Sequence, residues 1–486
     1  MILINEKEMS RKSLITTAIA YANGAPHIGH AFEFVMADTI TRYSRLSNDV
    51  YFITGMDEHG QKIEEKAKEK NISVHELVEM YAQTFRNLDK DLGVSYDFFV
   101  RTSDKEKHYR GAQALWNKLA EKGDLEKRTY KALYCVGCEE FKTEKDLNEN
   151  GECPIHLKKP EVVEEENYFF KLSKYRDEIK ARIQNDDLKI YPETRKNEIV
   201  ALLERGLEDV SFSRPKSKVS WGIPVPGDDT QVMYVWCDAL SNYVTAIGYG
   251  TDSFDEERWA DTTHIIGKDI LRFHAAIWPG MLLSAGLPLP KNILVHGHIT
   301  SGGQKMSKSL GNVIDPQELL TLFTEPAGEL AGEALRFILL YKIPSFEDGD
   351  LTIETIKETY TAHLANGIGN LTSRIMKMAG TSQTSLADAD LADYTLPVIQ
   401  DYDVKRTLES VMKRVGDLDK KIQEEEAFKV VKVDVEKGKE YIAGYLLELN
   451  GIAESLAVFM PQASAKIIKC IRENKMPEKP LFNRLP

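Results

Sequence analysis

The sequence predicts an α/β fold: a doubly wound parallel sheet of Rossmann type, interrupted by an inserted domain and followed by a C-terminal α-helical bundle. Residues 14–20 form an apolar, β-leaning run, and residues 28–43 repeat apolar positions with the period of a helix. The run 50–53 indicates a second strand, which ends near Asp57. Strand, turn, helix and strand open a doubly wound sheet, in which ligands bind where strands end and helices begin.

The later elements follow from changes in the apolar period. Helices are expected over 74–92 and 105–122, each after a capping box, at 73–76 and 103–106. Short β-like runs with turns then interrupt the pattern before strands and helices return. We therefore expect five parts: the first half of the α/β domain at 1–122, an inserted connective domain at 123–226, the second half of the α/β domain at 227–300, a connecting region at 301–350 and a helical domain at 351–486.

Composition indicates a cytoplasmic globular protein. The 486 residues, of which 42% are hydrophobic and 29% charged, suit roughly two to four domains. We find no uncharged apolar run long enough to span a membrane, and the start of the chain is too short and too charged for a secretory signal. The net charge of −13 argues against non-specific coating of nucleic acid, although local basic patches could still hold RNA.

Two histidines flank a glycine at the expected start of the helix over 28–43. Gly29 leaves room for a flat base against the backbone, and His27 and His30 stand where a helix N-terminus favours phosphate. Two imidazoles can donate hydrogen bonds to a phosphate that gains negative charge as it is attacked. In the structural alternative, one histidine caps the helix and the other lies in the core.

A second motif, Lys305-Met306-Ser307-Lys308-Ser309, follows a strand-like run and has glycines on both sides, which give the loop flexible ends. Its two lysines can reach the β- and γ-phosphates of a nucleotide and offset charge on a departing pyrophosphate. Together the two motifs resemble the hallmarks of the class I aminoacyl-tRNA synthetases. Over nearly its whole length the chain is similar to the methionyl-tRNA synthetases within that class.

The resemblance implies a methionine–tRNA ligase that works in two steps. The methionine carboxylate attacks the α-phosphate of ATP to give methionyl-adenylate and pyrophosphate, and the 3′ end of tRNA(Met) then displaces AMP. It implies as catalytic residues His27, His30, Lys305 and Lys308. It implies as the ATP site Gly29, His30, Asp269 and Lys308, with Mg²⁺ on the phosphates and Asp269 on the ribose hydroxyls.

The same resemblance places methionine in a pocket with aromatic and aliphatic walls. Asp57, at the end of a strand, is expected to hold the ammonium group. A thioether is apolar and polarizable and suits such walls, and Tyr21 or His274 could offer its sulfur a hydrogen bond. The methionine-binding residues implied are Ala18, Ile19, Tyr21, Asp57, Trp236, Leu240, Tyr243, Ile270, Phe273 and His274.

Three of the five cysteines and one histidine have the spacing of a metal site. Cys135 and Cys138 are followed by Cys153 and His156, so a short loop separates two close pairs of soft ligands. Side chains fill all four positions, and the expected ion is therefore one structural Zn²⁺ per chain. The alternative is two unrelated pairs. In the family such a zinc knuckle belongs to the insertion, where it would stiffen a cover over the active cleft.

The helical domain is expected to read the anticodon, as it does in the family. Asn370 and Arg374 lie one helical turn apart in a match to the family's anticodon helix. Phe428 stands where the family usually has a tryptophan on which a base stacks. The structural alternative for Asn370 and Arg374 is a solvated helix surface. From the end of the chain at Pro486 we expect a monomer.

Two other functions fit part of the sequence. One is a class I synthetase for another amino acid such as cysteine, although the cysteine enzyme holds its zinc in the amino-acid pocket and the cluster here lies in the insertion. The other is a small-molecule nucleotidyltransferase with the same His-x-Gly-His turn, although those chains are shorter and need no helical C-terminal domain. An RNA-binding module without catalysis is disfavoured by the intact histidines and lysines.

Overall fold

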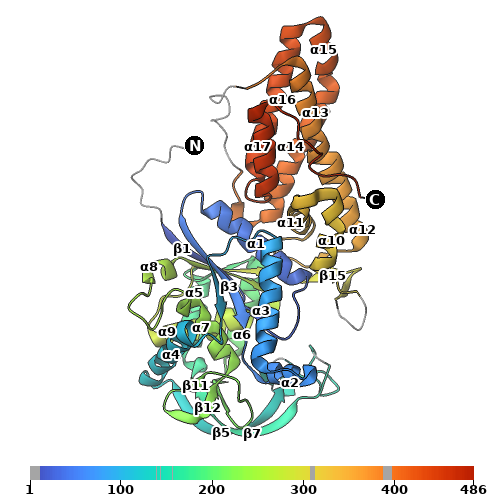
Figure 1. The fold of residues 1–486 in the computed structure, drawn as a ribbon. Helices are drawn as coiled ribbons and strands as arrows, with labels where there is room; N and C mark the ends of the chain where they lie inside the picture. The colour runs from blue at the N-terminus through green and yellow to red at the C-terminus, as the bar shows by residue number, and fades with distance from the viewer. Residues whose placement is uncertain are drawn as a thin grey trace.

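The protein has an α/β part and a helical part. The computed structural model describes residues 11–137, 140–142, 144–155, 157–306, 312–386 and 397–485. In Figure 1 the α/β part lies below, and the later helices, in orange and red, extend from it as an elongated bundle. In the described residues, helices long and apolar enough to cross a membrane are absent.

The main sheet of the described chain has seven parallel strands, in the order β2-β3-β1-β13-β14-β8 with β4 also paired to β3. A parallel sheet is the architecture that the sequence predicts, and its first long strand, β1, lies near the centre. The strands are β1 (Lys12–Thr17), β2 (Ala20–Tyr21), β3 (Asp49–Asp57), β4 (Phe98–Arg101), β8 (Lys189–Tyr191), β13 (Thr262–Gly267) and β14 (Asn292–His296).

Each face of this sheet has its own core. On β1, Ile15 belongs to the same buried cluster as Phe32 of α1 (Ile28–Ser44), whereas its neighbour Leu14 belongs to the cluster of Trp116 in α4 (Arg110–Glu121). Successive strand residues point to opposite faces, so helices cover both sides and the sheet is doubly wound. The other helices of this part are α2 (Gln61–Lys70), α3 (Val74–Asp91), α7 (Val235–Thr245), α8 (Glu256–Ala260) and α9 (Trp278–Ala285).

One of the two predicted capping boxes is confirmed and the other is wrong. Ser73 and Glu76 cap α3 reciprocally: the Ser73 hydroxyl accepts a backbone N–H at 3.1 Å and the Glu76 carboxylate accepts another at 2.8 Å. Before α4 it is Asp104, not Ser103, that caps the helical turn, because its carboxylate accepts two backbone N–H groups at 3.0 Å. The Ser103 hydroxyl instead donates to Glu58.

The segment 123–226 holds more than the short strands that its sequence pattern suggests. Two helices lie within it, α5 (Arg176–Gln184) and α6 (Glu193–Arg205), and β8 leaves it to pair with β14 in the main sheet. Its other strands belong to two small antiparallel sheets, ordered β6-β5-β7-β9 and β10-β12-β11. They are β5 (Leu125–Cys135), β6 (Glu140–Lys142), β7 (Glu161–Phe170), β9 (Val210–Ser211), β10 (Ser213–Pro215) and β11 (Pro224–Val225). The second sheet is completed by β12 (Asp228–Met233), which follows the segment.

After β14 the chain passes through a small sheet into the helical part. This sheet is ordered β16-β15-β17 and consists of β15 (Ile299–Ser301), β16 (Gln304–Lys305) and β17 (Gly349–Asp350). The helices that follow are α10 (Pro316–Ala327), α11 (Ala331–Lys342), α12 (Ile353–Thr359), α13 (Asn370–Ser382), α14 (Val404–Glu425), α15 (Ala427–Val433), α16 (Val435–Leu456) and α17 (Pro461–Glu473).

A buried arginine ties the helical part to the helix that begins at the histidine turn. The Arg336 guanidinium on α11 lies 2.7 Å from the carboxylate of Asp38 on α1, and it donates to the backbone carbonyl of Phe459, between α16 and α17, at 3.0 Å. Burial alone would raise the pKa of Asp38, but Arg336 and Arg42 outweigh it and lower that pKa. The charged carboxylate therefore anchors α1 to the helical part of the molecule.

Candidate active site

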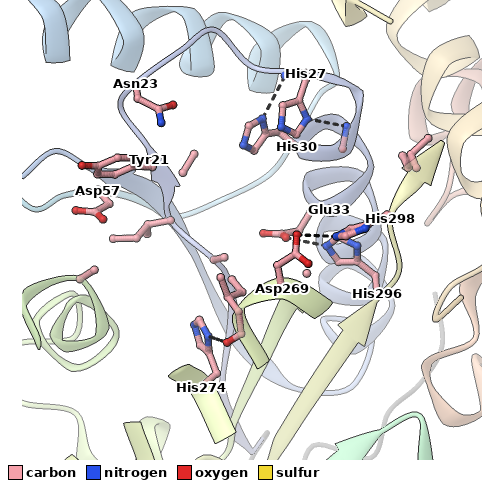
Figure 2. Close-up of a pocket in the computed structure, with 18 of the residues that line it drawn as sticks. Tyr21, Asn23, His27, His30, Glu33, Asp57, Asp269, His274, His296 and His298 are labelled. Atoms are coloured by element: carbon pink, nitrogen blue, oxygen red, sulfur yellow. Dashed lines mark hydrogen bonds and ion pairs between the residues drawn. The ribbon is translucent and has the colours of Figure 1, made fainter. Parts of the chain in front are cut away.

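A cavity of about 560 Å³ opens at the carboxyl ends of β1, β3, β13 and β14. Figure 2 shows the His27–His30 pair on one side, Tyr21 and Asp57 on a second, and Glu33, Asp269, His296 and His298 together on a third. The cavity walls include four predicted nucleotide-site residues, His27, Gly29, His30 and Asp269. They also include nine of the ten predicted methionine-site residues: Ala18, Ile19, Tyr21, Asp57, Trp236, Leu240, Tyr243, Ile270 and His274.

The two histidines cap α1 and face each other. His27 Nδ1 accepts the backbone N–H of Gly29 at 3.1 Å, and His30 Nδ1 accepts the backbone N–H of His27 at 3.2 Å, so the pair forms a capping box made of imidazoles. Their rings stack with centroids 3.8 Å apart. Because Nδ1 accepts in each ring, the hydrogen of the neutral ring lies on Nε2. The structural and the chemical interpretations of these histidines are therefore compatible.

Both histidines stay neutral near pH 7. Burial lowers the pKa of His27, and burial, helped by the neighbouring imidazoles of His27 and His296, lowers the pKa of His30 well below its usual value. A neutral imidazole with its hydrogen on Nε2 donates a single hydrogen bond from that atom. Two such donors at a helix N-terminus suit a phosphate group.

The apolar side of the cavity is built by α7 and the turn that precedes α9. Trp236 stacks on Phe273 at a centroid distance of 3.7 Å, so Phe273 supports the wall from behind. His274 Nδ1 donates to the carbonyl of Ile270 at 3.0 Å, and His274 Nε2 accepts the hydroxyl of Tyr243 at 2.8 Å. Both ring nitrogens of His274 are thus engaged, which favours Tyr21 as the donor to a thioether sulfur.

A carboxylate stands at the end of β3 beside that wall. Asp57 is the last residue of the strand, is 8% exposed and pairs in register with Tyr21 of β2. Both side chains line the cavity. A carboxylate next to an aromatic wall can hold an ammonium group while the walls hold an apolar side chain.

The third side carries acidic and imidazole groups that sequence reasoning missed, apart from Asp269. Glu33 lies one helical turn beyond His30, and its carboxylate lies 2.8 Å from His296 Nε2. Burial would lower the pKa of His296, but the hydrogen bond to Glu33 and its charge raise it. Asp269 lies 2.7 Å from His298 Nε2. The spacing of Glu33 after His30 was the available signal, since residues three apart share a helix face.

The lysine motif begins at this cavity. β15 and β16 form a hairpin whose turn residues, Gly302 and Gly303, have φ of 61° and 72°, values that favour glycine. Met306 lines the cavity. Lys305 ends β16, but its side chain lies outside what the structure describes, as does the whole of Lys308.

Two of the four predicted metal ligands lie among the described residues. Cys135, at the end of β5, and Cys153 are buried, with exposed fractions of 4% and 0%. Cys138 and His156 lie outside the described residues. Among the described side chains, clusters of three or more potential metal ligands are absent. Gly137, next to Cys138, lines the cavity, and its carbonyl accepts Lys62 Nζ at 3.4 Å.

The predicted anticodon residues lie in the helical part, away from the cavity walls. Asn370 begins α13 and is exposed. Arg374, one turn later, forms an ion pair with Asp419 of α14. Phe428 on α15 is 45% exposed, with Lys429 Nζ 5.7 Å from its ring centroid. Asp419 is six residues, or roughly 9 Å, before the end of α14, and α15 begins two residues after that end.

Comparison with known families gives one consistent match. The family of class I tRNA synthetases (M) matches residues 13–159 and 145–376. A methionine–tRNA ligase of Brucella suis is 44% identical over 382 residues, which cover 76% of this chain and 71% of the relative. A methionine–tRNA ligase of Rhizobium meliloti is 37% identical over 484 residues, covering 94% of this chain and 91% of the relative.

Solved structures agree over the whole chain. The methionyl-tRNA synthetase of Mycobacterium tuberculosis in complex with methionyl-adenylate superposes with a TM-score of 0.86 at 31% identity, covering 98% of both chains. The free form of that protein gives a TM-score of 0.79 at 28% identity, covering 99% of both chains. The helical part is therefore shared with these structures as well as the α/β part.

Proposed function

This chain belongs to the class I methionyl-tRNA synthetases, which are methionine–tRNA ligases, and we propose that its cavity forms methionyl-adenylate from methionine and ATP. The observation that carries the proposal is the meeting of three kinds of wall in one cavity: the imidazole pair of α1, the aromatic wall of α7 and the start of the lysine motif. The first suits phosphate, the second suits a thioether, and the third is represented on the cavity wall by Met306, next to Lys305 in the sequence.

Methionine is held between Asp57 and the aromatic wall. Asp57 binds the ammonium group, and Trp236, backed by Phe273, covers the side chain. The sequence predicts ten residues for this pocket. Nine members share the cavity, and Phe273 contributes by stacking on Trp236. The bound carboxylate then faces the nucleotide and needs no protein nucleophile, because it is already charged.

ATP lies along the imidazole pair. The Nε2 hydrogens of His27 and His30 donate to the α-phosphate as it gains negative charge under attack, while Gly29 leaves room for the base. Asp269 binds ribose hydroxyls from the third side of the cavity. Lys305 and Lys308 neutralise the leaving pyrophosphate, and Met306 on the cavity wall supports that placement. Mg²⁺ enters with ATP on its phosphates.

Cys135, Cys138, Cys153 and His156 would hold one Zn²⁺. The chemistry of the donor set fits this ion, and the burial of Cys135 and Cys153 in the inserted segment 123–226 supports it. The ion is structural, because four protein ligands fill its coordination positions. Bound there, the ion would stiffen the part of the inserted segment 123–226 whose Gly137 borders the cavity.

tRNA(Met) binds across both parts of the protein. Its 3′ end reaches the adenylate, and its anticodon meets Asn370, Arg374 and Phe428 on the helical bundle. The exposed ring of Phe428 and the exposed side chain of Asn370 support this arrangement. We also infer that the chain acts as a monomer in the cytoplasm.

The decisive experiment is ATP–pyrophosphate exchange with each of the twenty amino acids in turn. Methionine alone should support strong exchange, because the aromatic wall and Asp57 together fit a thioether amino acid. Exchange that is as fast with cysteine would point to the cysteine enzyme. Exchange that needs no amino acid, but a small phosphorylated acceptor, would point to a nucleotidyltransferase.

A further inference from the structure

A buried network of two histidines and one aspartate lies behind the methionine pocket. One carboxylate oxygen of Asp238 on α7 accepts a hydrogen bond from His59 Nδ1 at 2.6 Å, and the other accepts one from His108 Nε2 at 2.7 Å. The exposed fractions are 0% for Asp238 and 1% for each histidine. The mechanism proposed above uses none of the three, and none of them lines the cavity.

The network connects three elements that are distant in sequence. His59 lies two residues after Asp57, the last residue of β3. His108 lies in the helical turn before α4, and its Nδ1 lies 2.8 Å from the hydroxyl of Thr245. His59 Nε2 lies 3.1 Å from the hydroxyl of Tyr109, in the same turn. Each imidazole therefore has a partner on both nitrogens, and the aspartate joins them.

Helix α7 presents the network and the pocket on opposite faces. Trp236, Leu240 and Tyr243 line the cavity at spacings of four and three residues, so they share one face. Asp238 lies two residues from both Trp236 and Leu240, a rotation of roughly 200° around the helix. Thr245, seven residues after Asp238, shares its face. His108 therefore forms hydrogen bonds with that face of α7 at both Asp238 and Thr245.

Close packing fixes α4 against the end of α7. A Cβ atom on Gly111, at the start of α4, would lie 2.5 Å from Thr245 Cγ2 and 2.6 Å from the backbone oxygen of Tyr249, so α4 touches the end of α7 without space for a larger residue. The end of β3 is held as firmly: the N–H of Glu58 donates to the Thr102 hydroxyl at 2.8 Å.

We propose that His59, Asp238 and His108 are positioning residues that fix the spacing between Asp57 on β3 and the aromatic wall on α7, and so set the affinity for methionine. The inference rests on the proposed function of the cavity. It predicts that the network affects the binding of methionine and not that of ATP. The ammonium contact at Asp57 and the thioether contact at Trp236 belong to one small molecule. A shift of either element by about 1 Å therefore weakens methionine binding sharply, while the phosphate contacts at α1 remain.

The charge of Asp238 is the feature to remove first. Burial alone would raise the pKa of Asp238, but the two imidazoles outweigh it and lower that pKa, so the carboxylate is charged near pH 7. Asp238→Asn keeps the shape of the side chain but replaces one acceptor with an amide donor that opposes an imidazole N–H. We expect the KM for methionine to rise roughly tenfold or more, with the KM for ATP changed less than about twofold.

The control is a second buried aspartate of the same part of the molecule. Asp124 is 1% exposed, accepts hydrogen bonds from Lys174 and Ser284 at 2.7 Å each, and does not line the cavity. Asp124→Asn should lower the thermal unfolding midpoint without separating the two KM values. If Asp238→Asn behaves in the same way, the network serves only stability and the proposal is overturned.

Conservative histidine variants keep the test valid even if Asp238→Asn does not fold. The amide nitrogen of His59→Asn stands near the position of Nδ1, and that of His108→Gln near the position of Nε2, so each retains its donor to Asp238. We expect both to bind methionine nearly as the wild type does, and His59→Leu and His108→Leu to bind it roughly tenfold or more weakly. Equal affinity in the amide and leucine variants would overturn the proposal.

Methionine binding can also be measured without catalysis. Titration of each folded variant with methionine, followed by tryptophan fluorescence, reports a Kd because Trp236 lines the pocket. The Kd should rise in parallel with the KM. Failure of the wild type to show methionine-dependent exchange would reject the proposed function itself, whereas a normal wild type with an unaltered Asp238→Asn Kd would reject only the network.

Discussion

At the scale of single residues, the histidine turn has a structural role in the fold and, in the proposed function, a chemical role in the same side chains. His27 and His30 use Nδ1 to cap α1, and this use places their hydrogens on Nε2. The cap and the phosphate donor therefore depend on different atoms of one ring. Substitutions that keep one atom and lose the other can separate the two roles.

His27→Asn and His27→Gln are such a pair. The Asn side chain can accept the Gly29 N–H as Nδ1 does, so stability should stay within about 0.5 kcal/mol, while kcat for pyrophosphate exchange falls by roughly 10²–10³. The Gln side chain places an amide donor near Nε2, so it should keep more activity but lose the cap, at about 0.5–2 kcal/mol. Chemical unfolding and exchange kinetics measure the two effects. Parallel losses in both variants would contradict the separation of roles.

His274 gives the pH dependence that belongs to a single residue. Burial lowers its pKa from 6.5 to about 4. In that interval the unfolded histidine binds a proton and the folded one does not, so the unfolded state binds more protons and stability falls as the pH falls. The contribution of His274 is about 3 kcal/mol between pH 6.5 and 4.

The matched variant for this test is His274→Gln, which can still accept the Tyr243 hydroxyl but does not titrate. Unfolding by urea at several pH values between 6.5 and 4 should show a shallower loss of stability in the variant than in the wild type. Identical slopes would mean that folding does not lower the pKa of His274.

At the scale of elements, the predicted zinc knuckle is joined to the cavity by the residues that follow β5. β5 ends at Cys135, and the chain then passes Gly137, which lines the cavity and receives Lys62 of α2. Loss of the metal should therefore loosen one border of the active site as well as the knuckle itself. The α/β sheet and the bundle have their own buried cores and should persist.

Cys135→Ser and Cys153→Ser should each lower the zinc content from one per chain towards zero and lower kcat for exchange by roughly tenfold or more. Cys470→Ser, on the half-buried surface of α17, is the matched control and should retain both zinc and activity. Metal content by mass spectrometry and far-ultraviolet circular dichroism provide the measurements. Full zinc content in the two cysteine variants would reject the knuckle.

At the scale of the whole molecule, the sequence was sufficient where a pattern is long and local. The seventeen residues of α1 show a clear helical period, the nine of β3 contain the apolar run 50–53, and both elements form where they are expected. β8 has three residues, too few to show an alternation, and only pairing with β14 makes it a strand. His59 and Asp238 are 179 residues apart, so their contact had no local signal.

The distance between the cavity and the end of the bundle also separates two kinds of assay. We propose adenylate formation in the cavity, whereas Phe428 lies on α15, which Figure 1 places at the far end of the bundle. A stacking interaction with an anticodon base should therefore affect transfer to tRNA and leave the first step unchanged. Phe428 is half-exposed, so its replacement should cost little stability.

We expect Phe428→Ala to raise the KM for tRNA(Met) in aminoacylation by roughly tenfold, since stacking of one base on an aromatic ring is worth about 1–3 kcal/mol. Phe428→Trp should restore the affinity, because tryptophan offers a larger ring for the same contact. Val433→Ala, at an 87% exposed position of the same helix, is the control and should leave the KM unchanged. Pyrophosphate exchange should be equal in all three variants. An unchanged KM for tRNA in Phe428→Ala would place the anticodon elsewhere, and a loss of exchange would mean that the ring supports the fold instead of the RNA.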